Sequence, residues 1–218
     1  MNRPAQEIGQ ADVPSDPQPD QRGLLGPAPQ SIPAPEGDLA AIIEAWHGQL
    51  VVWARSGQLS RAAQIALQLP ADHPGLREFV SRVDQHDFRD LPLIRPLDSE
   101  AMEDSACAYA PEKRLILINQ DWLEEALVEQ VVAVLSEQLG HHLDVLFNPW
   151  DTQGDEGELF LECLRGDPSD ATIALFRDHN EDRGVVHLNG EDLAVDEAGF
   201  GAVCLDLRDL PHHDTPQP

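Results

Sequence analysis

The sequence predicts an α+β fold, with a small sheet, a long helix beside it and a helical lobe on the N-terminal side. Three stretches lead to this class. Residues 114–119 contain four consecutive apolar residues, which is typical of a buried strand. Residues 121–144 carry apolar residues three or four positions apart, which predicts one long amphipathic helix. Residues 38–83 repeat that spacing in three shorter segments, which predicts the lobe.

The helical lobe is expected to begin at Asp38, whose side chain suits an N-cap. Gly57 interrupts the apolar spacing and separates the first helix from the second, and Pro70 follows the end of the second. A third helix is expected over residues 74–83. Because each helix has one apolar face, we expect the lobe to pack against the part of the chain that follows.

The second half of the chain mixes strand and helix signals. A strand and turn at residues 107–113 precede the 114–119 strand, and a second, acidic helix opens at Asp155 after the long helix. The later elements are a short helix (168–178), a hairpin around an Asn-Gly pair (185–195) and a last strand (200–210). An Asn-Gly pair between β-branched runs favours a two-residue hairpin turn.

Composition divides the chain into four parts. Residues 1–37 are rich in Pro, Gln and Asp and poor in apolar residues, so we expect a disordered leader. Residues 38–87 are assigned to the helical lobe and residues 88–210 to the main domain. Residues 211–218 resemble the leader in composition and are expected to form a disordered tail.

The charge of the chain limits its partners. Its 40 acidic and 14 basic residues give a formal net charge of −26. Repulsion on that scale argues against nucleic acid and anionic membranes, and it leaves a protein or peptide as the expected partner. A solvated acidic surface accounts for this charge, and surroundings rich in calcium or salt would also suit it. The sequence does not determine the oligomeric state.

The sequence contains no recognisable membrane or secretory segment and no clear disulfide pattern. No apolar run approaches the length of a membrane helix, so no membrane insertion is expected, and residues 1–21 lack the apolar core of a secretory signal. The three cysteines, Cys107, Cys163 and Cys204, are widely spaced and show no CxxC pattern. They do not form a disulfide framework, and the sequence does not choose among the possible pairs.

The end of the long helix carries the main candidate for chemistry. In zinc peptidases of the HExxH type, two metal ligands lie four residues apart on one helical face, and a Glu beside the first is the general base. Here Glu137 and His141 take the two ligand positions. Gln138 takes the base position and cannot accept a proton. His142 falls on the apolar face instead, so we expect a hydrogen-bonded core histidine.

A third ligand is expected from the acidic helix, where Glu156 lies fifteen residues beyond His141. One imidazole and two carboxylates suit zinc and also manganese or iron. Glu158, two residues further on, and Asp144, on the same face of the long helix as Glu137 and His141, are the candidates for the missing base. Two other interpretations remain open: Glu137 and His141 can form a surface i,i+4 pair, and the acidic residues can complement the helix dipole.

Two acidic segments have calcium-loop spacing. Asp151, Gln153, Asp155 and Glu162 match positions 1, 3, 5 and 12 of an EF-hand loop, but position 6 holds Glu156 where Gly is required. Residues 178–184 carry a second such spacing with its Gly one place late. Ordinary turn chemistry explains both segments, and calcium is kept as an alternative cofactor.

The segments DFRDLP, AYAPEKRLILINQDWL, SEQLGHHLDVLFNPWDTQGDEGELFLECLRG and HLNGEDLAVDEA resemble a zincin-like domain found in large secreted bacterial proteins, especially cyanobacterial ones with RTX calcium-binding repeats. The resemblance covers residues 88–195, about half of the chain. The Glu-Glu-x-Gly-His helix motif of that family falls at Glu137, Gln138 and His141. The resemblance implies a metallopeptidase-like fold and export without a cleaved signal; a cytoplasmic location is the alternative.

Two functions follow from these observations. The first is a metallopeptidase-like protein, a degenerate zincin with weak or no activity, in which Glu137, His141 and Glu156 hold the metal. A working peptidase would also need an open strand edge for its substrate beside residues 114–119. The second is a non-catalytic acidic binding module of a secreted protein, which binds a protein partner or calcium. Gln138 favours the loss of peptidase activity, because removal of a general base lowers the reaction rate by about 10²–10⁴-fold.

Overall fold

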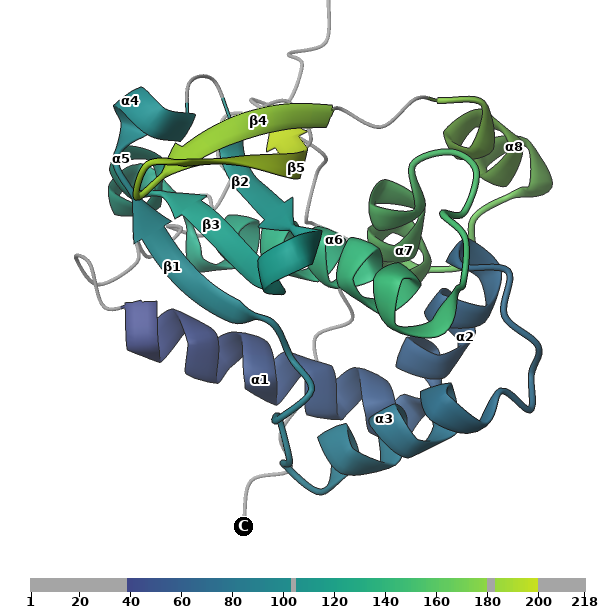
Figure 1. The fold of residues 1–218 in the computed structure, drawn as a ribbon. Helices are drawn as coiled ribbons and strands as arrows, with labels where there is room; N and C mark the ends of the chain where they lie inside the picture. The colour runs from purple at the N-terminus through teal and green to yellow at the C-terminus, as the bar shows by residue number, and fades with distance from the viewer. Residues whose placement is uncertain (1–38, 103–104, 180–182, 200–218) are drawn as a thin grey trace, which may run out of the picture. The chain divides into compact units, whose positions relative to one another are not determined.

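Eight α-helices and a five-stranded mixed sheet make up the part of the chain that this computed structural model describes, residues 39–102, 105–179 and 183–199 (Figure 1). This confirms the α+β class. The predictions made for Asp38, the leader, the strand at 200–210 and the tail lie outside the described residues. No described helix is both long enough and apolar enough to cross a lipid bilayer.

The helices and strands follow one another in this order. The first three helices are α1 (Leu39–Ser56), α2 (Gln58–Ala66) and α3 (Pro74–Asp84). They are followed by β1 (Leu93–Leu97), α4 (Ser99–Met102), β2 (Ser105–Ala110), a 3₁₀ turn (Pro111–Lys113) and β3 (Leu115–Asn119). The remaining elements are α5 (Gln120–Glu125), α6 (Val128–Phe147), α7 (Glu156–Arg165), α8 (Asp170–Asp178), β4 (Arg183–Leu188) and β5 (Glu191–Gly199).

The predicted helix over residues 121–144 is wrong in its boundaries, because two helices, α5 and α6, occupy this stretch. Ala126 and Leu127 between them are extended, with ψ angles of 147° and 150°. The Leu127 N–H donates to the side chain of Gln130 at 2.8 Å, which caps the start of α6. This local hydrogen bond replaces the helical one, and the apolar spacing alone does not reveal it.

The hairpin prediction is confirmed. Residues Leu188 and Glu191 pair across the turn, and Asn189 and Gly190 both have positive φ angles, 54° and 86°. Two consecutive positive φ angles define the turn type for which Asn-Gly is the preferred pair. β4 and β5 therefore form the hairpin that the sequence predicts.

The strand order in the sheet is β1-β3-β2-β5-β4. β1 pairs with β3 in parallel, with Leu93 opposite Leu115, and the other pairs are antiparallel. β3 therefore has a strand on each side, and its edges are not open. The open strand edge that a working peptidase would need beside residues 114–119 is therefore not present, because β1 pairs with β3 there.

One hydrophobic core joins the helical lobe to the sheet. Buried side chains of α1, α2 and α3 share it with β2, β3, α6 and α7, and Figure 1 shows α1 and α6 on the same side of the sheet. The Trp46 indole on α1 donates to the Ser136 hydroxyl on α6 at 3.1 Å, and both side chains are buried. Residues 39–87 and 88–199 thus do not have separate cores. A smaller cluster joins Met102 of α4 to buried side chains of β2, β3 and the β4–β5 hairpin, among them Leu117.

Candidate metal centre

Two glycines bring α6 and α7 into close contact. A Cβ atom at Gly140 would lie 2.8 Å from the Gly157 Cα and 2.9 Å from the Phe160 Cβ, so only a residue without a side chain fits there. Such small residues let two helix backbones approach closely. The polar residues on either side of Gly140, from Glu137 to His141, are therefore held against the first turn of α7.

His141 and Glu156 form the centre of this contact. The Nδ1 atom of His141 lies 2.9 Å from Oε1 of Glu156, and each side chain is only 4 % exposed. A Cβ atom at Gly157 would come within 2.2 Å of the His141 Nε2, so this glycine makes room for the imidazole ring. The structure thus brings together two of the three predicted metal ligands.

Glu137 and Gln138 are also enclosed, at 2 % and 0 % exposure. Four buried side-chain atoms of this group have no hydrogen-bond partner within the described part of the chain: Glu137 Oε2, Gln138 Nε2, Gln138 Oε1 and Glu156 Oε2. Leaving one such atom unsatisfied costs about 1–3 kcal/mol, and native interiors contain few of them. Glu137, Gln138, His141 and Glu156 are together called the buried polar centre below.

Burial and charge shift the pKa values in this centre. Burial raises the pKa of Glu137 to about 8, although nearby His141 opposes the shift. Burial alone would lower the pKa of His141, but the hydrogen bond and the negative charge of Glu156 outweigh it and raise the pKa to about 10. In the absence of a metal, the His141 imidazole is therefore protonated at neutral pH and lies in hydrogen-bond contact with the Glu156 side chain.

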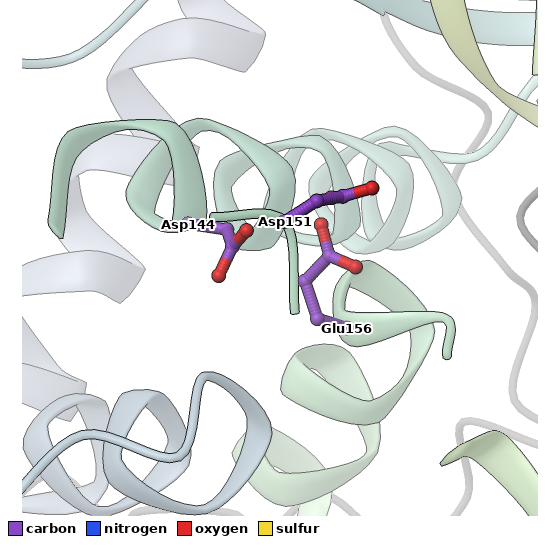
Figure 2. A group of neighbouring side chains, drawn as sticks. All are labelled: Asp144, Asp151 and Glu156. Atoms are coloured by element: carbon purple, nitrogen blue, oxygen red, sulfur yellow. The ribbon is translucent and has the colours of Figure 1, made fainter. Parts of the chain in front are cut away.

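Another group has its ligand atoms closer together. One atom each from Asp144, Asp151 and Glu156 lies within 4.8 Å of the others, and in the described residues no such group includes Glu137 or His141. Figure 2 shows the Glu156 carboxylate pointing from the start of α7 toward α6. Sequence reasoning did not select Asp144 and Asp151 as partners of Glu156, because the α6–α7 loop alone brings them together.

Hydrogen bonds already occupy much of this acidic group. Asp144 accepts from the Thr152 N–H at 3.1 Å and from the Thr152 hydroxyl at 2.5 Å, and Asn148 also donates to it. Asp151 is exposed and forms an ion pair with Arg183. Asp144 therefore stabilises the loop after α6. The sequence feature that could have indicated this role is the presence of the polar residues Asn148 and Thr152 four and eight positions after Asp144.

The remaining candidates fall into structural roles. Asp155 is the N-cap of α7, where it accepts from the Glu158 N–H at 2.7 Å, and half-buried Glu158 lies in the first turn. This agrees with the helix-dipole interpretation. The surface i,i+4 pair is wrong, because Glu137 and His141 are both buried. The second calcium spacing includes Asn180 and Asp182, which lie outside the described residues.

The prediction for His142 is confirmed. Its Nε2 lies 2.8 Å from the Asp90 carbonyl, which can only accept, and its Nδ1 lies 2.8 Å from the Tyr109 hydroxyl. The neutral imidazole therefore donates through Nε2 and accepts through Nδ1. Burial lowers the pKa of His142 to about 4. This residue joins α6 to β2 and to the loop before β1.

The fold and the centre define an α+β protein in which two closely packed helices enclose a His–carboxylate pair. Comparison with known proteins adds no relative: no family model, curated protein or solved structure matches the chain. The class to which the protein belongs therefore rests on its own residues.

Proposed function

We propose that this chain is a zincin-like, metallopeptidase-like domain without efficient peptidase activity, in which a buried divalent cation links α6 and α7. Glu137, His141 and Glu156 would hold the cation. The observation that carries the proposal is the set of unpartnered buried atoms, which includes one carboxylate oxygen each of Glu137 and Glu156. A buried carboxylate that has no hydrogen-bond or ion-pair partner is stabilised when a bound cation balances its negative charge.

The donor types fit zinc, manganese or iron. One imidazole and two carboxylates are ligands that all three ions accept. The Glu137 carboxylate would have to turn toward His141, because the three residues do not form a group with ligand atoms within 4.8 Å of one another. His141 would also lose a proton, since only the neutral imidazole binds a metal, so binding is expected to weaken progressively as the pH falls below about 10.

Two observations favour loss of peptidase activity. Gln138, at the position of the general base, is 0 % exposed and has no proton-accepting carboxylate. β3 is paired on both sides, so a peptide cannot add to the sheet beside it. Glu158, a candidate for a replacement base, is half-buried in the first turn of α7. The domain would use its cation for stability rather than for hydrolysis.

The decisive experiment is the metal content of the full chain, purified without a metal-affinity tag and measured by mass spectrometry. Glu137→Gln removes one ligand charge without touching the His141–Glu156 pair, and Asp151→Asn is the matched control outside the buried polar centre. About one zinc, manganese or iron per chain is expected in the wild type and in Asp151→Asn. A lower content is expected in Glu137→Gln.

Two results would contradict the proposal. One is a wild-type chain that retains none of the three ions after incubation with each and dialysis. The other is a Glu137→Gln variant that retains its metal in full together with a His141→Ala variant that does the same. Circular dichroism shows whether each variant is folded.

Loss of catalysis is tested separately with Gln138→Glu. Wild-type protein loaded with zinc is expected to cleave a casein substrate no faster than the His141→Ala variant. If Gln138→Glu raises cleavage by about 10²-fold or more, the change at this position caused the loss. Efficient cleavage by the wild type would overturn the proposal that the domain is inactive.

An acidic module that binds calcium is the second candidate, and the spacing of Asp144, Asp151 and Glu156 favours it. Calcium prefers oxygen ligands, which this group supplies. Calcium binding that persists in His141→Ala and disappears in Asp151→Asn would favour this module over the first proposal.

A further inference from the structure

The turn between β4 and β5 lies outside the buried polar centre and carries a reactive pair of residues. Asn189 and Gly190 form this turn, both are exposed, and both have positive φ angles, 54° and 86°. A Cβ atom at Gly190 would meet no atom within 4 Å, so the space beside this glycine is open. The Asn189 side chain and the Gly190 N–H are thus neighbours in the chain at an open end of the hairpin.

The other described asparagines, Asn119 and Asn148, are held in place. Asn119 is buried, and its amide nitrogen donates to the Ser105 carbonyl at 3.1 Å. The amide nitrogen of Asn148 donates to the Leu67 carbonyl at 3.0 Å. Pro149 follows Asn148 and has no backbone N–H. Neither asparagine therefore combines a mobile amide with an accessible N–H on the next residue.

Asn189 differs from both. Within the part of the chain that the structure describes, neither its side chain nor the Gly190 N–H has a hydrogen-bond partner. An amide that no hydrogen bond holds can turn its Cγ atom toward the next backbone nitrogen, and glycine has no Cβ atom to obstruct the approach. We propose that Asn189 is a modification site, where the asparagine deamidates without an enzyme and the isoaspartate product loosens the β4–β5 hairpin.

The reaction needs only water. The Gly190 backbone nitrogen attacks the Asn189 Cγ and loses its proton, and the side-chain nitrogen leaves as ammonia. A five-membered succinimide ring now joins the two residues. Water opens this ring at either carbonyl carbon, which gives aspartate or isoaspartate. The net change consumes one water and releases one ammonia, and no group of the metal centre takes part in it.

The two products affect the hairpin differently. Leu188 and Glu191 pair across the two-residue turn, and aspartate preserves this turn because Asp-Gly is also a favoured pair. Isoaspartate adds a carbon atom to the backbone, so the same two residues no longer fit the turn that closes the Leu188–Glu191 pair. Buried Val186 of β4 and Leu193 of β5 belong to one apolar cluster, and their contact depends on this pairing.

The test is peptide mass spectrometry of the full folded chain after incubation at neutral and at mildly alkaline pH. Replacement of the amide –NH₂ by –OH raises the mass of the peptide that contains residue 189. Because only Gly190 is both exposed and without a Cβ atom, conversion at Asn189 is expected to be at least about tenfold faster than at Asn119 or Asn148. The rate is expected to rise with pH, since the attacking nitrogen must lose its proton. Asn189→Gly, which keeps a Gly-Gly turn, is expected to show no mass increase in this peptide.

Hydrogen exchange measures the effect on the hairpin. The isoaspartate fraction is expected to exchange the amides of β4 at least about tenfold faster than Asn189→Asp, which carries the same charge on an unaltered backbone. Equal exchange in the two proteins would contradict the loosening. The modification site itself is overturned if Asn189 stays intact in the folded chain over a period in which the urea-unfolded chain is largely converted.

Discussion

Gly157 shows how one missing side chain allows two helices to enclose a polar pair. The His141 ring occupies the space that a Cβ atom would need, and Gly140 meets Gly157 at the same contact. A side chain at either position pushes α6 and α7 apart. The position of the buried polar centre therefore depends on these two glycines as much as on its own ligands.

Gly157→Ala is expected to lower the free energy of unfolding by about 1–3 kcal/mol, because the added methyl group overlaps the His141 ring. Gly166→Ala, just beyond the other end of α7, is the matched control, since no atom lies within 4 Å of its Cβ position. Urea unfolding of both variants in EDTA measures the difference. Equal losses at the two positions would mean that the close contact does not limit stability.

His142 predicts how acid affects the metal-free fold. Its pKa is lowered to about 4 in the folded protein, from an ordinary value of 6.5. Between these values the unfolded chain binds the proton more readily, so the stability that neutral His142 contributes is present above pH 6.5 and is lost toward pH 4. The slope from this group reaches about 1.4 kcal/mol per pH unit at most.

Urea unfolding between pH 7 and pH 4.5, with EDTA present, tests this expectation. His142→Gln keeps a donor and an acceptor but does not titrate, so its stability relative to that of the wild type is expected to rise as the pH falls below about 6.5. Glu137, whose raised pKa acts in the opposite direction, is common to both proteins and cancels in this difference. Parallel curves for the two proteins would rule out His142 as a source of the pH dependence.

At the scale of elements, β2 is the most enclosed strand. All six of its residues are buried, and it lies between β3 and β5 in the sheet. Cys107 on β2 and Cys163 on α7 are free thiols in the interior. Burial raises the pKa of Cys163 to about 12 and that of Cys107 further. Both thiols are therefore protonated and inaccessible in the folded protein.

A thiol reagent measures whether these two elements open. In a Cys204→Ser variant, which removes the thiol outside the described residues, less than about one tenth of a thiol per chain is expected to react quickly at pH 8. Two thiols are expected to react after denaturation. Rapid reaction of either cysteine in the folded variant would show that β2 or α7 opens under native conditions.

For the whole molecule, the net charge of −26 is a source of self-repulsion. Salt shortens the range of this repulsion, so added NaCl is expected to stabilise the fold by screening. The melting temperature of the metal-free chain should rise by several degrees between about 20 and 200 mM NaCl, as measured by circular dichroism. An unchanged or lower melting temperature would mean that the acidic side chains are too widely spaced to repel one another.

Local patterns in the sequence were sufficient to predict several elements of this protein. The apolar spacing in α6, the Asn189-Gly190 turn and the core position of His142 were all predictable, because each depends on residues at most four positions apart. The same information placed Glu137 and His141 on one face of α6. The break between α5 and α6 was missed, since the capping side chain of Gln130 does not alter the apolar spacing.

The tertiary structure alone decided how these pieces combine. It placed β1 beside β3, enclosed Gln138 and gathered Asp144 and Asp151 near the start of α7. Local spacing carries no record of such contacts, because they arise only when separate apolar faces are buried together in one core.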